Sequence, residues 1–251
     1  MPYFSITQFN LCFLTIQIWG VFVGLAFVVG LFFIIWRIKN TKFDQIDILN
    51  LSVLVFIGAV VGARIGYAFL YPFSSFKDFL MLNSGGFTFH GGLLVAILLG
   101  WWYVSKKRLN FCKLADIFAP AIALGIFVGR IGCFLINDHI GTITKLPWGI
   151  VWSDGVMRHP IALYLSLNGL LLFFILWFLK NKFNKEGALF LFFLIYYSIT
   201  RFLLDFLRVG DPKIGCLFIS QWLSLTMVVV IGILSVKLFV IARERSERSN
   251  L

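Results

Sequence analysis

Long apolar stretches dominate this chain, and three of them contain an arginine. Arg64, Arg130 and Arg201 lie in GAVVGARIGYAFLY, ALGIFVGRIGCFLI and FFLIYYSITRFLLDF, respectively. Stretches this long and apolar are typical of helices that cross a membrane. A charged side chain at that depth costs about 2.5–3.5 kcal/mol even on the most lenient scale. Three such charges in one small protein predict a polar cavity between helices that holds an anionic ligand.

The composition excludes an ordinary soluble domain. Of the 251 residues, 60% are hydrophobic and 13% are charged, and the mean hydropathy is +0.94. A soluble domain carries about 25% charged residues. At about 20 apolar residues per crossing, the chain has room for roughly six to eight helices and none for a separate soluble domain. We therefore predict an all-α polytopic membrane protein, with residues 1–251 as one integral membrane domain.

Stretches without charge place seven predicted spans, at about 12–36, 48–71, 88–105, 114–136, 159–179, 187–207 and 216–241. The first is too long for a cleaved signal peptide and lacks its basic flank. Between the second and third spans, 73–82 is predicted to be an amphipathic helix on the outer surface.

Lysine and arginine are distributed unequally between the two sets of loops. The loops after the first, third, fifth and seventh spans hold fourteen of them, whereas the opposite loops hold five. Positive residues concentrate on the cytoplasmic side of membrane proteins. We therefore predict an outside N-terminus and a cytoplasmic C-terminus. The net charge of +11 then reflects topology and contact with anionic lipid headgroups, not nucleic-acid binding.

The unusual polar residues share one depth in this topology. With a rise of about 1.5 Å per residue, Arg64, His90, Arg130 and Arg201 all fall in the outer half of their spans. Trp19 falls in the outer part of the first span. We therefore expect a cavity that opens toward the outer leaflet, rather than a pore through the middle of the membrane.

The sixth span carries several polar residues on one helical face. Tyr197, Arg201 and Asp205 are spaced by four, and Arg208 follows on nearly the same face. Asp205 can pair with Arg201 and orient its guanidinium group. The alternative is an ion pair that only lowers the cost of membrane insertion, but this leaves the arginines of the other two spans unexplained.

Six short elements occur in order along the chain. They are FHGG (89–92), GRIGCFLINDHIG (129–141), LPWG (146–149), RHP (158–160), Tyr-x-x-x-Arg-Phe-x-x-Asp-Phe-x-Arg (197–208) and QWLS (221–224). In this order they resemble the prolipoprotein diacylglyceryl transferase family, and the resemblance extends over most of the chain.

The resemblance implies a reaction. The family moves a diacylglyceryl group from phosphatidylglycerol to the thiol of a lipobox cysteine in a secreted precursor, and releases glycerol-1-phosphate. A sulfur thus displaces a phosphate ester at a glycerol carbon, and a thioether forms. Guanidinium groups suit this chemistry, because their fork matches phosphate oxygens and they stabilise the charge that develops on the leaving phosphate.

The implied partners are phosphatidylglycerol, lipobox-containing prolipoprotein precursors and membrane lipids, in a bacterial cytoplasmic (inner) membrane. We expect no cofactor, no metal and no nucleic acid. The four cysteines show no metal-ligand spacing.

The resemblance also implies residue roles. Arg130 contacts the phosphate, and Arg201 acts with Tyr197 and Asp205 at the family's tyrosine and acid positions. His90 matches the motif histidine and is the best candidate to accept the proton of the substrate thiol, since a thiolate is the nucleophile. A hydrogen-bonded helix end is the alternative for this histidine. The other predicted substrate-binding residues are Arg64, Asp138, Arg208 and Trp19.

The chain departs from the family pattern at several positions. Cys133 stands where the family commonly has asparagine, Trp19 where it has tyrosine, and Asp205 where it usually has glutamate. The polar and acidic residues that usually follow RHP are replaced by Ile161, Ala162 and Leu165. These departures leave the details of substrate positioning open. Two alternative functions also stay open: a carrier or flippase for an anionic lipid or solute, and a family member that binds lipid without chemistry.

Overall fold

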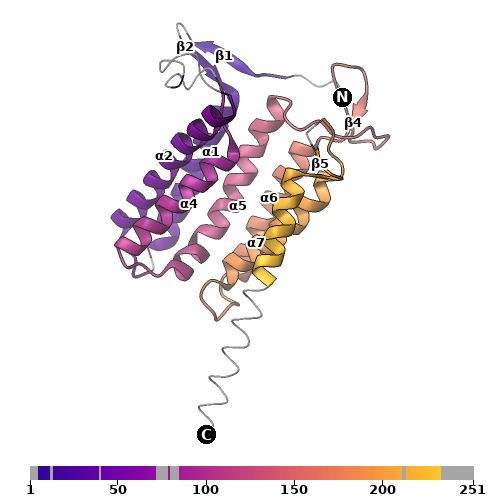
Figure 1. The fold of residues 1–251 in the computed structure, drawn as a ribbon. Coiled ribbons are helices and arrows are strands. Elements are labelled where there is room, and N and C mark those ends of the chain that lie inside the picture. The colour runs from indigo at the N-terminus through magenta and orange to yellow at the C-terminus, as the bar shows by residue number, and fades with distance from the viewer. Residues whose placement is uncertain are drawn as a thin grey trace.

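A computed structural model describes residues 5–11, 14–39, 41–71, 79, 85–210 and 213–232. Seven helices lie in this part of the chain and run side by side in one bundle (Figure 1). They are α1 (Ile18–Ile38), α2 (Gln45–Leu70), α4 (Phe89–Lys106), α5 (Phe111–Leu135), α6 (Ile161–Leu179), α7 (Ala188–Asp205) and a last helix, Ile219–Gly232. Five of them, α1, α2, α5, α6 and α7, are long and apolar enough to cross a membrane. The chain is therefore an all-α polytopic membrane protein, as the sequence predicts.

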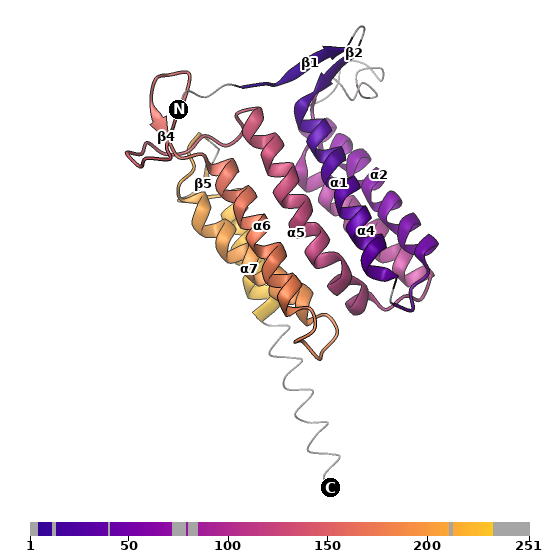
Figure 2. The same ribbon diagram turned by 180° about the vertical axis from the view of Figure 1, so that it is seen from behind.

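Three small antiparallel hairpins complete the described part of the chain. They pair β1 (Gln8–Leu11) with β2 (Leu14–Gln17), β3 (Ile150–Val151) with β4 (Met157–Arg158), and β5 (Lys213–Ile214) with β6 (Leu217–Phe218). All three lie at the same end of the bundle (Figures 1 and 2). We call this end the hairpin end.

The predicted spans match the helices to within three residues at every described end but one. The prediction of a helix from residue 12 is wrong, because α1 begins at Ile18 and the preceding residues form β2. Thr15 and Ile16 are β-branched and favour a strand, and Gln17 pairs with Gln8 across the hairpin. Residues 233–241 of the last predicted span lie outside the described residues, as does the predicted surface helix 73–82 apart from Phe79.

Helix α5 lies in the middle of the bundle. It packs against α1 on one side and against α6 and α7 on the other, while α2 and α4 pack together beyond α1 (Figures 1 and 2). Glycines permit the closest approaches. A Cβ atom at Gly62 would lie 2.6 Å from the carbonyl oxygen of Gly91, and one at Gly132 would lie 2.5 Å from the Cβ of Phe22. Small residues at such contacts let membrane helices approach each other closely.

A side chain from α1 supplies a hydrogen bond that a proline removes from α5. Pro120 has no N–H, so the carbonyl of Asp116, four residues earlier, loses its helical hydrogen bond. The Nη1 of Arg37 donates to that carbonyl at 3.1 Å and to the next one at 3.2 Å. The Asp116 carboxylate accepts hydrogen bonds from the N–H groups of Gly187, at 2.7 Å, and Phe190, at 2.8 Å. These bonds fix the positions of α1, α5 and α7 relative to one another along the bundle axis.

The helices alternate in direction. Helices α1, α4 and α6 end where α2, α5 and α7 begin, at the end of the bundle opposite the hairpins (Figures 1 and 2). The C-terminal parts of α5 and α7 therefore meet at the hairpin end. These parts carry Arg130 and Arg201, so the fold brings two of the three predicted membrane arginines to one place.

Candidate active site

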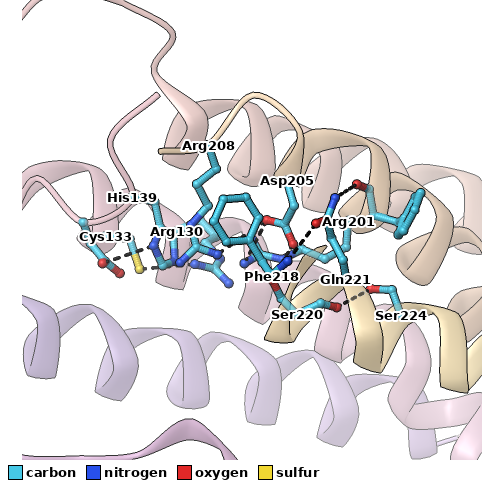
Figure 3. A network of polar contacts seen from close by, with 12 residues as sticks. Arg130, Cys133, His139, Arg201, Asp205, Arg208, Phe218, Ser220, Gln221 and Ser224 are labelled. Carbon is cyan, nitrogen blue, oxygen red and sulfur yellow. Dashed lines mark hydrogen bonds and ion pairs between the residues drawn. The ribbon is translucent and has the colours of Figure 1, made fainter. Parts of the chain in front are cut away.

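A buried carboxylate, Asp205, organises a polar network at the hairpin end (Figure 3). Its side chain has 0% exposure. Its Oδ1 lies 3.3 Å from Arg201 Nη2 and 3.5 Å from Arg208 Nη1. Its Oδ2 accepts a hydrogen bond from Ser220 Oγ at 2.6 Å. One carboxylate therefore holds two guanidinium groups and joins α7 to the last helix.

The two arginines held by Asp205 are themselves buried. Arg201 is 7% exposed and Arg208 is 8% exposed. The Nη1 of Arg201 is buried and has no hydrogen-bond partner within the described part of the chain. A buried donor left without an acceptor costs about 1–3 kcal/mol. This nitrogen is therefore a candidate to bind an oxygen atom of a ligand.

Arg130 brings a third guanidinium group to the network, from α5. Its Nη1 lies 3.8 Å from the Sγ of Cys133, one turn further along the helix. It also interacts electrostatically with Tyr197 and Arg201 of α7. Figure 3 shows the Arg130 side chain beside His139. The structure therefore brings together predicted site residues from the fourth and sixth spans.

The loop that follows α5 is clamped against the chain that follows α7. An antiparallel bridge pairs Gly141 with Arg208. Beside it, the N–H of Thr142 donates to the carbonyl of Leu207 at 2.8 Å. This pairing fixes the position of the loop, and with it the side chains of residues 138 and 139, relative to the arginines.

His139 is the residue of this loop that sequence reasoning missed. Its side chain is 15% exposed, and its Nδ1 lies 3.2 Å from the Oδ1 of Asp138. Burial and the positive charges of Arg208, Arg130 and Arg201 lower the pKa of His139 from 6.5 to about 2. The ring is therefore neutral at pH 7. No spacing in the sequence indicates this location, because the clamp that creates it joins segments far apart in the chain.

The last helix closes the network. Gln221 is 1% exposed. Its Oε1 accepts a hydrogen bond from the N–H of Phe218 at 3.0 Å, and its Nε2 donates to the carbonyl of Phe202 on α7 at 3.3 Å. The QWLS element marks this residue in the sequence. No sequence element includes Ser220, whose hydroxyl group contacts Asp205.

The predicted site residues of the first two spans lie on the other side of the hairpin end. Arg64 is 2% exposed; its Nε donates to the carbonyl of Phe79 at 2.9 Å and its Nη1 to that of Gly86 at 2.9 Å. Its guanidinium carbon lies 5.2 Å from the ring centroid of Phe87, which is 6.1 Å from the half-buried ring of Trp19. Arg64 thus links α2 to the described residues just before α4. Its contact with a lipid headgroup stays a prediction, as does that of Trp19.

His90 lies in the first turn of α4 and is exposed. Its ring contacts the neighbouring Phe89 ring at a centroid distance of 5.8 Å. Between described residues, no hydrogen bond or ion pair joins His90 to Arg130, Arg201 or Asp138. Its role as proton acceptor for the thiol stays a prediction.

A cavity of about 220 Å³ opens beside the clamped loop. Its lining includes Asn137, Trp152 and the exposed ion pair of Asp154 with Arg158, whose atoms lie 2.9 Å apart. The arginines around Asp205 are not part of this lining. The cavity is therefore separate from the polar network.

The network carries an excess of positive charge. Three guanidinium groups, those of Arg130, Arg201 and Arg208, face two carboxylates, those of Asp138 and Asp205. Charges in a water-poor site interact far more strongly than in water. The arrangement is suited to bind one monoanionic group, such as a phosphodiester, and to stabilise negative charge that develops on it.

Comparisons with known proteins show which family the chain resembles. The family model described as Prolipoprotein diacylglyceryl transferase matches residues 7–237. The phosphatidylglycerol–prolipoprotein diacylglyceryl transferase of Idiomarina loihiensis is 35% identical over 241 residues, which cover 88% of this chain and 91% of the relative. The enzyme of the same name from Vibrio atlanticus is 39% identical over 230 residues, which cover 84% of this chain and 83% of the relative. Because these matches extend over most of its length, the chain belongs to the prolipoprotein diacylglyceryl transferase family.

Proposed function

We propose that this protein transfers the diacylglyceryl group of phosphatidylglycerol to the cysteine thiol of prolipoproteins. The names of its relatives include phosphatidylglycerol and prolipoprotein. In this reaction the thiolate sulfur attacks a glycerol carbon, the bond from that carbon to the phosphate oxygen breaks, and glycerol-1-phosphate leaves. The observation that supports it most is the buried Nη1 of Arg201, which has no partner within the described residues and lies in a site with surplus positive charge.

The arginines act on the phosphate. Arg130 and Arg201 approach the site from two different helices, so they can contact different oxygens of one phosphate group. Asp205 holds Arg201 and Arg208 in place and limits the number of uncompensated charges. Tyr197 interacts with Arg130 and helps to orient it. Because phosphate gains negative charge as it leaves, these contacts strengthen in the transition state and accelerate the reaction.

The protein lies in the bacterial cytoplasmic membrane, with its N-terminus outside and its C-terminus in the cytoplasm. The fourteen-to-five distribution of cations supports this orientation. The hairpin end, with Arg130, Arg201 and Arg208, then faces the outer side, where secreted precursors emerge. Reporters fused at residues 3 and 251 test the orientation. Cytoplasmic activity of the N-terminal reporter would overturn it.

One assay tests the function. Purified protein is mixed with phosphatidylglycerol and a lipobox peptide, and the mass of the diacylglyceryl adduct is measured. We expect the adduct with phosphatidylglycerol but not with phosphatidylcholine, and not with a peptide that has serine in place of the cysteine. Arg201→Ala should abolish the adduct, whereas Asp154→Asn, at an exposed ion pair outside the network, should retain it. Lipid binding or lipid movement without any adduct would favour a carrier or a catalytically inactive member instead.

A further inference from the structure

A carboxylate and an imidazole form a pair at the edge of the arginine network. Asp138 Oδ1 lies 3.2 Å from His139 Nδ1, and the His139 side chain is 15% exposed. Figure 3 shows the imidazole beside the Arg130 side chain. The loop cannot easily move away, because its next residues pair with the chain that follows α7.

The pairing determines which ring nitrogen is available. Nδ1 lies 3.2 Å from a carboxylate oxygen of Asp138, and a carboxylate that near favours the tautomer with its proton on Nδ1. In a neutral ring, Nε2 then has a free lone pair and accepts hydrogen bonds or protons. This is how a carboxylate orients a histidine that acts as a general base.

The surrounding charges decide when this nitrogen can take a proton. The charged groups that act on the ring are Asp138 of the loop, Arg130 of α5, Arg201 of α7 and Arg208 after it. Behind them, Cys133 contacts Arg130 and Asp205 pairs with Arg201 and Arg208. Burial and the three arginines hold the pKa of His139 at about 2 when no ligand is bound. A bound phosphate adds one negative charge beside these arginines, and an opposite charge within about 4–6 Å raises the pKa of a histidine by about 1–3 units.

We propose that the Asp138–His139 pair is the proton acceptor for the substrate thiol, and that it accepts this proton only after the anionic phosphate of the lipid has bound to the neighbouring arginines. Nε2 takes the proton from the thiol. The sulfur then forms its bond to the glycerol carbon, and the phosphate leaves with the electron pair of the broken carbon–oxygen bond. The imidazolium finally releases its proton to water.

This inference rests on the proposed function and adds two things to it. It moves the role of base from His90, which is exposed and has no hydrogen bond or ion pair with the network among the described residues, to His139. It also orders the reaction, because the lipid must bind before the thiol is deprotonated.

The first test measures protonation and needs no transfer. The protein is placed in nanodiscs with isotope-labelled histidine, and ring signals are followed from pH 4 to pH 8. The chain has three histidines, so His90→Asn and His159→Asn variants assign the signals. In phosphatidylcholine, the His139 ring should stay neutral over this range. With phosphatidylglycerol, its midpoint should rise by about 1–3 units, so that partial protonation appears at the acid end. The same titration in both lipids would overturn the proposal.

The second test measures transfer by a His139→Asn variant. Asparagine tolerates the left-handed backbone at this position, where φ is 67°. Its amide nitrogen replaces Nδ1 next to Asp138, but nothing replaces Nε2. We expect kcat to fall about 100-fold or more, with little change in KM for phosphatidylglycerol. The rate of the variant should rise steadily toward pH 8.5, where about half of the substrate thiol ionises unaided.

A double variant, His139→Asn with Asp138→Asn, tests whether the two residues act as one unit or independently. The double variant should be hardly slower than His139→Asn alone, since groups that act as a unit give non-additive losses. A His139→Asn variant with the kcat of the parent would overturn the proposal, and a large loss in His90→Asn alone would return the role to His90. Failure of the parent to form any adduct would instead contradict the proposed function, while the titration would still decide whether lipid controls His139.

Discussion

Replacing Asp205 with asparagine should be among the most damaging single changes in this protein. The carboxylate has 0% exposure and is the counter-charge of two arginines that are only 7% and 8% exposed. Asparagine keeps the shape and can still accept a hydrogen bond from Ser220, but it removes the charge. Breaking a buried ion pair in this way costs about 3–5 kcal/mol, because the remaining charges stay buried without compensation.

The chain offers a matched control. Arg158 and Asp154 form an ion pair with the same four-residue separation as Arg201 and Asp205, at 2.9 Å, but the Asp154 side chain is 47% exposed. An exposed pair contributes about 0–1 kcal/mol. The Asp154→Asn variant should therefore unfold at nearly the same denaturant concentration as the parent.

The assay is denaturant unfolding of both variants in the same detergent micelles, together with phosphatidylglycerol binding and transfer. Asp205→Asn should still bind the anionic lipid, because its network has gained net positive charge, but it should transfer poorly because Arg201 is no longer oriented. An unfolding free energy for Asp205→Asn equal to that of Asp154→Asn would refute the argument from buried charge.

Three further predictions concern other parts of the structure. Arg130→Lys and Arg201→Lys should both fail to support transfer, because an ammonium group cannot make two parallel bonds to a phosphate; near-normal turnover at normal membrane levels would show that charge alone suffices. Gly62→Ala should destabilise the protein by about 1–3 kcal/mol, since its Cβ would lie 2.6 Å from a backbone oxygen of α4, whereas a Cβ at Gly24 meets nothing within 4 Å. Equal unfolding midpoints for these two alanine variants would contradict that packing. The lowered pKa of His139 means that the unfolded chain, with its histidine pKa of 6.5, binds a proton that the folded chain does not. Stability should therefore fall as the pH drops below about 6.5, by about 2 kcal/mol between pH 7 and pH 5, and a His139→Asn variant with the same loss would rule this histidine out as the cause.

The apolar helices could be predicted from the sequence because a lipid environment makes helix formation a local property. With the exception of groups such as the Asp116 carbonyl, which Arg37 reaches from α1, backbone groups find their partners within their own helix, so an apolar stretch of sufficient length predicts a helix by itself. The one wrong boundary is at β2 (Leu14–Gln17), a strand whose hydrogen bonds come from β1 rather than from its own segment. The pairing of Arg201 with Asp205 is equally local, since four residues along a helix bring the two side chains together.

The composition of the site depended on the tertiary structure. Arg130 and Ser220 reach the Asp205 network only because the heights of α5, α7 and the last helix are fixed by contacts between residues far apart in the chain. The same is true of His139, which nothing in its neighbouring sequence separates from a histidine in an ordinary loop. Conversely, Arg64 looks like its two counterparts in the sequence, yet its guanidinium group binds carbonyls of its own chain. Hydropathy and spacing determine the depth of a charged residue, but its partners depend on which distant segments the fold packs against it.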